Sequence, residues 1–276
     1  MQVLEAAVGE LANPWPLRRE RAAELQTRYP HAADVLRIYQ ALIPVWETAF
    51  KTFPPPPAGE GQGGGSDVAA FAVARVLPAI IDATVASGPA RLRDGVISVF
   101  CTADLTDLVR RWLDDKPLNP FETYLARAST VPVLEAAAPS FPSPSGGGQG
   151  GGSETKCPRC SGLPQLSYFA VSGEALVTGP RYLVCSRCNH NWIFPRMTCA
   201  SCGETNPAKL PIYQEHDAYP HVRVDGCRSC HRYLLSFDLR RDTRAVPVVD
   251  ELACLPLDLF ARDQGLTKIT PNLVGN

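Results

Sequence analysis

Four Cys-x-x-Cys pairs between residues 157 and 230 constrain this chain more than any other feature. The first two pairs are separated by 24 residues, and the same arrangement returns after 42 residues. This repeat indicates an internal duplication of a unit that contains two pairs. The eight cysteines are Cys157, Cys160, Cys185, Cys188, Cys199, Cys202, Cys227 and Cys230.

A Cys-x-x-Cys turn directs two sulfurs to one point, so two such turns can complete a closed tetrahedral shell around one metal ion. The order along the chain predicts that the first four cysteines form site 1 and the last four form site 2. Ser161-Gly162 and Gly203 follow the opening pairs, and glycine there allows the backbone to turn toward the sulfurs. We expect two mononuclear sites that hold iron, as in rubredoxin, or zinc, since four thiolates suit both metals.

Disulfides and redox dithiols are the alternatives to metal sites. Disulfides require an oxidising compartment, and Glu5 and Glu10 interrupt the first apolar stretch, which therefore does not resemble a signal peptide. Redox dithiols usually occur as one pair at the start of a helix. The regular repeat favours metal binding in a reducing cytoplasm.

Composition indicates a globular protein of two domains. The chain has 276 residues, with 27 Lys and Arg against 28 Asp and Glu, whereas a dedicated nucleic-acid-binding protein is usually more basic. No apolar run was identified that reaches the roughly 18 residues of a membrane span, so no membrane insertion is predicted. We expect a cytoplasmic location.

Residues 1–145 are predicted to form a helical domain, with an internal flexible linker at 54–66. Residues 32–53 have a buried stripe at helical spacing, and Pro44 should kink or split that helix. Asp67 is a candidate N-cap for a helix to Ala86 that Pro78 should bend.

The rest of this domain is also predicted to be helical. Residues 92–113 form one expected helix, in which Cys101 is interpreted as a core residue. Two shorter helices are expected at 120–128 and 133–138. A glycine-rich linker at 146–153 then marks the domain boundary; the sequence leaves open whether both linkers are natural or engineered.

Residues 154–247 change to short β-rich segments between the cysteine pairs, which is typical of tandem rubredoxin-like or zinc-ribbon lobes at about 154–195 and 196–247. The overall fold class is therefore α+β. A C-terminal helix and tail occupy 248–276, with the helix from Asp250 to Gln264 and Cys254 in its core. The expected strands are 166–171, 182–184, 191–194, 210–214, 222–224 and 233–239.

Few other residues indicate chemistry. His190 and His231 follow complete four-cysteine sets, so they are interpreted as neighbours of the sites or surface residues. No catalytic motif was found. The loop before the last pair is interpreted as an exposed recognition loop, and its partner-binding candidates are Glu215, His216, Asp217 and Tyr219.

The order of these features resembles the formate dehydrogenase accessory protein family, FdhE. The motifs behind the resemblance are Cys157-Pro158-Arg159-Cys160, the run Cys185–Trp192, Cys199–Gly203, the run Cys227–Leu234 and the terminal Gly265–Asn272. The two glycine linkers depart from the usual pattern of the family.

The resemblance implies a cytoplasmic assembly factor, or chaperone, and not an enzyme. Such a protein binds the catalytic subunit of a respiratory molybdopterin formate dehydrogenase and supports its maturation before export. The eight cysteines would hold rubredoxin-type iron or zinc. Two alternatives stay open: a zinc-ribbon nucleic-acid-binding protein, since residues 154–250 have 12 basic and 9 acidic side chains, and a one-electron carrier. The sequence also leaves a homodimer open.

Overall fold

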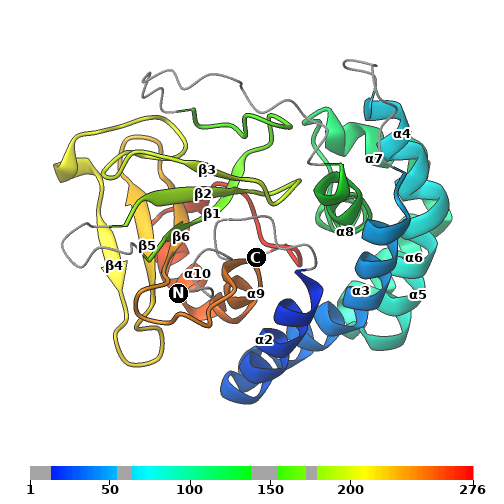
Figure 1. The fold of residues 1–276 in the computed structure, drawn as a ribbon, viewed down its shortest axis with the longest axis horizontal. Helices are drawn as coiled ribbons and strands as arrows, with labels where there is room; N and C mark the ends of the chain where they lie inside the picture. Colours follow the sequence, from blue (N-terminus) through cyan, green and yellow to red (C-terminus); the bar gives the residue numbers. More distant parts are fainter. Residues whose placement is uncertain (1–13, 55–63, 138–153, 172–178, 276) are drawn as a thin grey trace.

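The computed structural model describes residues 14–54, 64–137, 154–171 and 179–275. Figure 1 shows a helical body on one side and a twisted sheet on the other, with the C-terminal helices α9 and α10 beneath the sheet. The predicted α+β class is confirmed, with helices first, then the sheet and then the C-terminal helices. The glycine linker at 146–153 and the predicted domain end at residue 145 lie outside the described residues.

The helical body contains seven α-helices in the described ranges. Its longest helix, α3, contacts α2, α5 and α8, and its buried residues include Leu36, Leu42 and Trp46. Pro44 lies inside α3 without ending it. The helices are α2 Trp15–Arg28, α3 Ala33–Thr52, α4 Gly64–Phe71, α5 Leu77–Ser87, α6 Ala90–Thr102, α7 Leu105–Leu113 and α8 Pro120–Ala136, with a 3₁₀ turn at Pro30–Ala32.

Several helix boundaries differ from the predictions. Helix α4 begins at Gly64, within the predicted linker 54–66 and before the predicted N-cap Asp67. A π-helical turn, Ala72–Val76, precedes α5, so the chain accommodates Pro78, which has no backbone N–H, by widening the helix.

The predicted helix at 92–113 was wrong as one piece. Asp104 caps a new helix, α7, by accepting hydrogen bonds from the backbone of Thr106 and Asp107. Conversely, α8 is continuous through the break expected between 128 and 133. Asn119 and Glu122 form a capping box at its start, which fixes its first turn.

The two remaining cysteines have different environments. Cys101 is exposed on α6, so its interpretation as a core residue was wrong. The apolar residues of α6 do not all lie on one face of the helix. In the structure Val96 and Val99 are buried, whereas Cys101 is on the exposed side. Cys254 is 1% exposed, as predicted.

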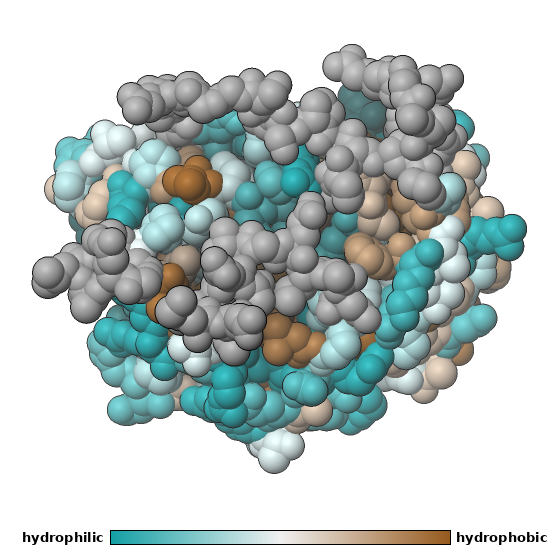
Figure 2. Space-filling model, in the orientation of Figure 1, coloured by the Kyte–Doolittle hydropathy of each residue, from teal (hydrophilic) through white to brown (hydrophobic). Residues whose placement is uncertain are grey.

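One stretch of the helical body, Val68–Ser87, is long and apolar enough to span a membrane, with a mean hydropathy of 1.8. The prediction that no run reaches this length was therefore wrong. In the structure 44% of the stretch is buried, and α5 contacts α3, α6 and α8. Figure 2 shows one face of the molecule on which hydrophobic residues form small separate areas. Length and hydropathy alone are weak evidence for a span.

All six predicted strands are present, and both cysteine lobes share one sheet. Within each lobe the strands are antiparallel, and β1 of the first lobe pairs in parallel with β6 of the second. The order is β3-β2-β1-β6-β5-β4, with β7 beside β6. The strands are β1 Pro164–Phe169, β2 Arg181–Cys185, β3 Asn191–Ile193, β4 Ile212–Gln214, β5 Val222–Cys227, β6 Arg232–Asp238 and β7 Thr267–Lys268.

The predicted C-terminal helix is divided near Cys254 into α9 Pro247–Asp250, a 3₁₀ turn Glu251–Ala253 and α10 Leu255–Asp263. Pro256, in the first turn of α10, explains the division, because proline cannot donate the helical hydrogen bond. Helix α9 contacts α2, so the C-terminal segment joins the sheet to the helical body.

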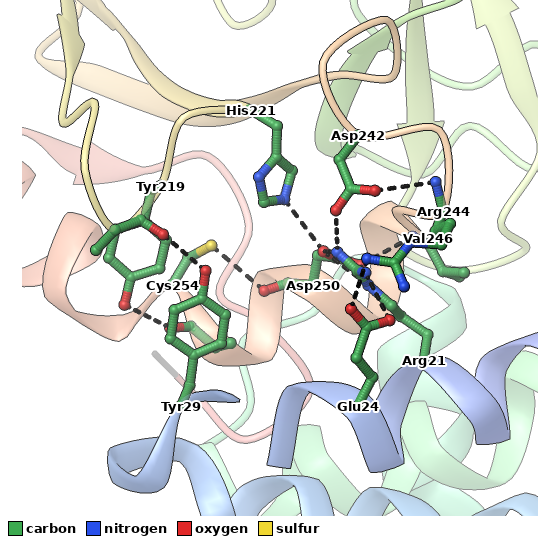
Figure 3. Close-up of polar contacts among 12 residues, drawn as sticks. Arg21, Glu24, Tyr29, Tyr219, His221, Asp242, Arg244, Val246, Asp250 and Cys254 are labelled. Carbon is green, nitrogen blue, oxygen red and sulfur yellow. Dashed lines mark hydrogen bonds and ion pairs between the residues drawn. The ribbon is translucent and has the colours of Figure 1, made fainter. Parts of the chain in front are cut away.

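Arg21 of α2 is the centre of this joint (Figure 3). Its guanidinium donates to Asp250 at 2.5 and 2.9 Å and to Asp242 at 2.8 Å. Arg21 and Asp250 are each 2% exposed. Burial alone would lower the pKa of Arg21, but hydrogen bonds and charge from Asp250 outweigh it and raise the pKa. His221 Nε2 lies 3.2 Å from Asp250 Oδ1 in the same cluster.

We predict that Arg21→Met lowers the free energy of unfolding by about 3–5 kcal/mol, because it leaves the Asp250 carboxylate buried without its cation. Arg19→Met is the matched control on the same helix, since Arg19 is exposed and makes a surface ion pair with Glu47, worth less than about 1 kcal/mol. Denaturant unfolding of the metal-loaded proteins measures both values. Equal losses in the two variants would contradict the prediction.

Asp242 gives the joint a defined dependence on pH. Burial would raise the pKa of Asp242, but the hydrogen bonds from Arg21 and from the backbone of Arg244 lower it overall. A carboxyl with a lowered pKa stabilises the fold above its ordinary pKa, and this contribution is lost as pH falls through the folded-state pKa.

We therefore expect the stability difference between the wild type and Asp242→Asn to be constant between pH 7 and pH 5 and to shrink below about pH 4. Both proteins lose metal at acid pH, and the difference between their unfolding free energies in one pH series removes that shared effect. A difference that grows on acidification would contradict this assignment.

Candidate metal centres

All four Cys-x-x-Cys turns have the same backbone geometry. The residue after each second cysteine has a positive φ: Ser161 at 57°, Asn189 at 52°, Gly203 at 75° and His231 at 55°. In the first turn Ser161 adopts the left-handed conformation, and Gly162 has a different role. A Cβ on Gly162 would lie 2.9 Å from Cys185 Sγ, so only glycine leaves room for that sulfur.

The first cluster contains Cys157, Cys160, Cys185 and Cys188, whose sulfurs all lie within 4.8 Å of one another. Separations of 3.8 Å for Cys157–Cys188 and 3.3 Å for Cys160–Cys185 are too long for disulfides. Zn–S bonds of about 2.3 Å in a tetrahedral shell place sulfurs about 3.8 Å apart, so the spacing is close to that of a four-thiolate metal site.

The second cluster contains Cys199, Cys202, Cys227 and Cys230, also within 4.8 Å of one another. Both measured separations, Cys199–Cys230 and Cys202–Cys227, are 3.7 Å, as tetrahedral coordination requires. The predicted sequential grouping of the eight cysteines is therefore the grouping seen in space.

Four thiols in contact cannot all lose their protons without a cation. In the first cluster, hydrogen bonding with Cys160 lowers the pKa of Cys157, whereas hydrogen bonding with Cys157 raises the pKa of Cys188. In the second cluster, burial raises the pKa of Cys199. Such coupled groups release protons stepwise, and a bound metal ion favours the thiolate at every position. The donor set therefore fits a metal ion in both clusters.

The surroundings of the two clusters differ in exposure. In the first, Arg187 donates to the backbone carbonyl of Trp112 at 2.8 Å and to the Asp115 carboxylate, so this cluster lies against the end of α7. Three of its cysteines are buried. In the second, Cys202 is exposed and Cys230 is partly exposed. Reagents in solution therefore reach the second cluster more easily.

The histidines beside the clusters are not among the grouped ligands. His190 is partly buried. Its burial lowers its pKa, and the charge of Arg159 lowers it further by a smaller amount. His231 is exposed and forms part of the last cysteine turn. Neither belongs to the described groups of metal-binding side chains, in agreement with the interpretation from sequence.

The predicted recognition loop is partly exposed and partly internal. Glu215, His216 and Asp217 are exposed, and the Glu215 carboxylate accepts hydrogen bonds from the backbone of residues 217–219, which lowers its pKa. Tyr219 is only 5% exposed and stacks on Tyr29 of the helical body, with ring centroids 5.2 Å apart. A partner could reach the carboxylates and His216, while Tyr219 fixes the loop.

Sequence reasoning missed a third polar cluster, formed by His221, Asp242 and Asp250 (Figure 3). Its composition alone could suit a metal ion. However, Arg21 already donates to both carboxylates, so a guanidinium supplies the positive charge there. No local sequence motif predicts this cluster with its cation, because Arg21 and Asp250 are 229 residues apart.

The sheet, the four turns and the two thiol clusters define a protein with tandem zinc-ribbon-like lobes attached to a helical body. A family model described as "FdhE, C-terminal domain" matches residues 197–274. Residues 197–274 are therefore similar to the C-terminal domain of FdhE proteins, and the resemblance predicted from the sequence is confirmed.

Curated proteins agree with this assignment. "Protein FdhE homolog" of Aquifex aeolicus is 31% identical over 119 residues, 43% of this chain and 41% of the relative. "Protein FdhE homolog" of Pseudomonas aeruginosa is 35% identical over 126 residues, 44% of this chain and 40% of the relative. The matched segments thus span about two fifths of these relatives.

The similarity in fold is wider than the similarity in sequence. The crystal structure of the FdhE protein from Pseudomonas aeruginosa superposes with a TM-score of 0.68 at 22% identity. The superposition covers 94% of this chain and 95% of the other. The helical body and the sheet therefore occur together in a solved protein.

We predict that zinc leaves the two clusters at different rates. After loading with two equivalents of zinc and addition of excess chelator, the exposed second cluster should release its metal in a fast phase and the buried first cluster in a slow phase. Cys202→Ser/Cys227→Ser should abolish the fast phase, and Cys157→Ser/Cys185→Ser the slow phase. A single phase for both equivalents, or a fast phase in the first of these variants, would contradict the prediction.

Proposed function

We propose that this chain is an accessory factor for the formation of formate dehydrogenase and that its eight clustered cysteines bind two metal ions. The FdhE match over residues 197–274 is the observation that carries the accessory role. The metal proposal is supported by the two sets of four sulfurs, each within 4.8 Å. The proposed partner is the catalytic subunit, bound in the cytoplasm before export.

The role of the bound metals is proposed to be structural. When bound, iron would supply one-electron chemistry and zinc would supply none, and four thiolates suit either ion. The chain itself provides closed sets of four ligands, which leave no position for a substrate or for water. This arrangement supports a binding protein in preference to a hydrolase.

Metal binding is also proposed to hold the sheet together. Each cluster joins a turn before the first strand of its lobe to a turn between two later strands, and both lobes share one sheet. A lobe of this size buries little core, so metal binding supplies much of its folding free energy. Loss of one ligand is therefore expected to loosen the lobe that contains it.

The docking surface for the catalytic subunit is proposed to include the exposed part of the loop, Glu215, His216 and Asp217. Glu215 also shapes the loop through its backbone hydrogen bonds. Tyr219 holds the loop in place by stacking on Tyr29, at the end of α2, and its hydroxyl donates to the Ala253 carbonyl of the C-terminal segment at 3.1 Å. His216 and Asp217 can therefore be changed with little effect on the fold.

The test is an anaerobic affinity purification from cells grown with formate, with mass spectrometry of bound proteins and a metal assay of the same eluate. We expect the wild type to recover a molybdopterin-type formate dehydrogenase catalytic subunit. His216→Ala/Asp217→Ala should reduce the recovery while the metal content stays at two per chain. Arg37→Ala/Asp34→Ala, an exposed pair on α3, is the control and should bind as the wild type does.

Two results would contradict the proposal. Recovery of nucleic acid or ribosomal proteins without the catalytic subunit would favour a zinc-ribbon nucleic-acid-binding protein. Undiminished recovery with the His216→Ala/Asp217→Ala variant would remove the loop from the docking surface and leave the accessory role standing.

A further inference from the structure

A cavity of about 130 Å³ lies over the face of the sheet where the two lobes meet. Its walls come from β1, β5 and β6, and residues 196–200, which connect the lobes, cover one side. One water needs only about 10–15 Å³ of such space, so this cavity has room for a side-chain-sized group. The proposed role in formate dehydrogenase formation does not use it.

Two arginines that line this cavity, Arg196 and Arg223, both lie against the ring of Phe169. The guanidinium carbons of Arg196 and Arg223 lie 4.8 and 4.5 Å from the centre of the Phe169 ring. Stacking on an aromatic ring orients a guanidinium and leaves its edge free to donate hydrogen bonds. Both arginines line the cavity, so the arrangement presents two oriented sets of N–H donors to it.

These donors are only partly used within the described residues. Arg196 donates to the Gly179 carbonyl at 3.3 Å through Nη1. Arg223 forms an ion pair with Asp225, in which Nε lies 2.9 Å from Oδ1 and Nη2 donates to Oδ2 at 3.4 Å. A guanidinium has five N–H donors, so both arginines keep donors for a carboxylate ligand in the cavity.

Asp225 pairs with Arg223, but it is one carboxylate against four arginines in the lining of the cavity. Its Oδ2 already accepts from Ser236 at 2.6 Å and from Arg181 at 3.2 Å. Each of the three nitrogens of the Arg181 guanidinium already has a partner, since Arg181 also donates to Ser167 and to the Thr198 carbonyl. The cavity therefore keeps an excess of positive charge, with Arg196 and Arg223 as donors for a ligand.

The mouth of the cavity is apolar. Met197 is 49% exposed and Ile212 is 46% exposed, and both line the opening. Ile212 belongs to β4, the last strand in the described sheet order. A polypeptide that places an apolar residue on Met197 and Ile212 could also lie along this strand. A free inorganic anion would leave these side chains uncovered.

We propose that this cavity binds the carboxylate of an acidic side chain on a partner polypeptide, with Arg196 and Arg223 as the donors and Met197 and Ile212 as the contact for an adjacent apolar residue. Carboxylates match the planar donor edge of arginine. The cavity lies in one chain, so this binding can be tested without formate dehydrogenase, and its failure and the failure of the proposed function are separate results.

The test is an NMR titration of the arginine Nε–H groups in the full-length, metal-loaded protein. The probes are acetyl-Leu-Glu-Leu amide, the matching Leu-Gln-Leu peptide and inorganic phosphate. We expect a saturable shift of the Arg223 Nε–H with the glutamate peptide and at least fivefold weaker binding of the glutamine peptide. Arg196→Gln should weaken the binding at least fivefold, and Arg37→Gln, at an exposed position of α3, should leave it unchanged.

Three outcomes would overturn the proposal. The first is the absence of a saturable shift, and the second is equal affinity for the glutamate and glutamine peptides. The third is binding of phosphate without binding of the glutamate peptide, which would make the cavity a site for free inorganic anions. Because Arg196 is exposed, Arg196→Gln should retain the wild-type unfolding midpoint, and Met197→Ser gives a second variant that weakens peptide binding without removing a charge.

Discussion

Four sulfurs held within 4.8 Å of one another are the constraint on which the sheet depends. Each cluster joins two turns that are far apart in sequence, and each turn uses a residue with positive φ to bring its sulfurs inward. Without a cation, contact between the thiols prevents all of them from ionising, whereas a metal ion stabilises the four thiolates. Folding of each lobe and metal binding by its cysteines are therefore coupled.

The duplicated lobes are joined through backbone pairing between β1 and β6 and through the hydroxyls of Ser167 and Ser236, 2.5 Å apart. The C-terminal segment then connects this sheet to the helical body through Arg21 and Asp250. The first cluster also contacts α7 through Arg187, so one of the contacts between the helical body and the sheet lies beside a cysteine cluster. A change in metal occupancy of the first cluster can therefore affect how the two parts fit.

The two clusters have different exposures, and their surroundings suggest different uses. The first is buried against helices, which suits a structural role. The second lies near the arginine-lined cavity and the end strand β4, where a partner polypeptide can approach. The proposed docking loop and the two cavity arginines Arg196 and Arg223 belong to the second lobe, which contains most of the segment matched to the FdhE domain.

The sequence by itself determined the grouping of the eight cysteines, the six main strands and the helical character of the first half. Ligand spacing and hydrophobic periodicity are local properties, so they can be recognised without a structure. The exposure of Cys101, the parallel β1–β6 pairing, the Arg21 joint and the cavity with Arg196 and Arg223 follow only from the tertiary structure. These features depend on which distant residues meet, as Arg21 and Asp250 do across 229 positions, and no local pattern encodes such a contact.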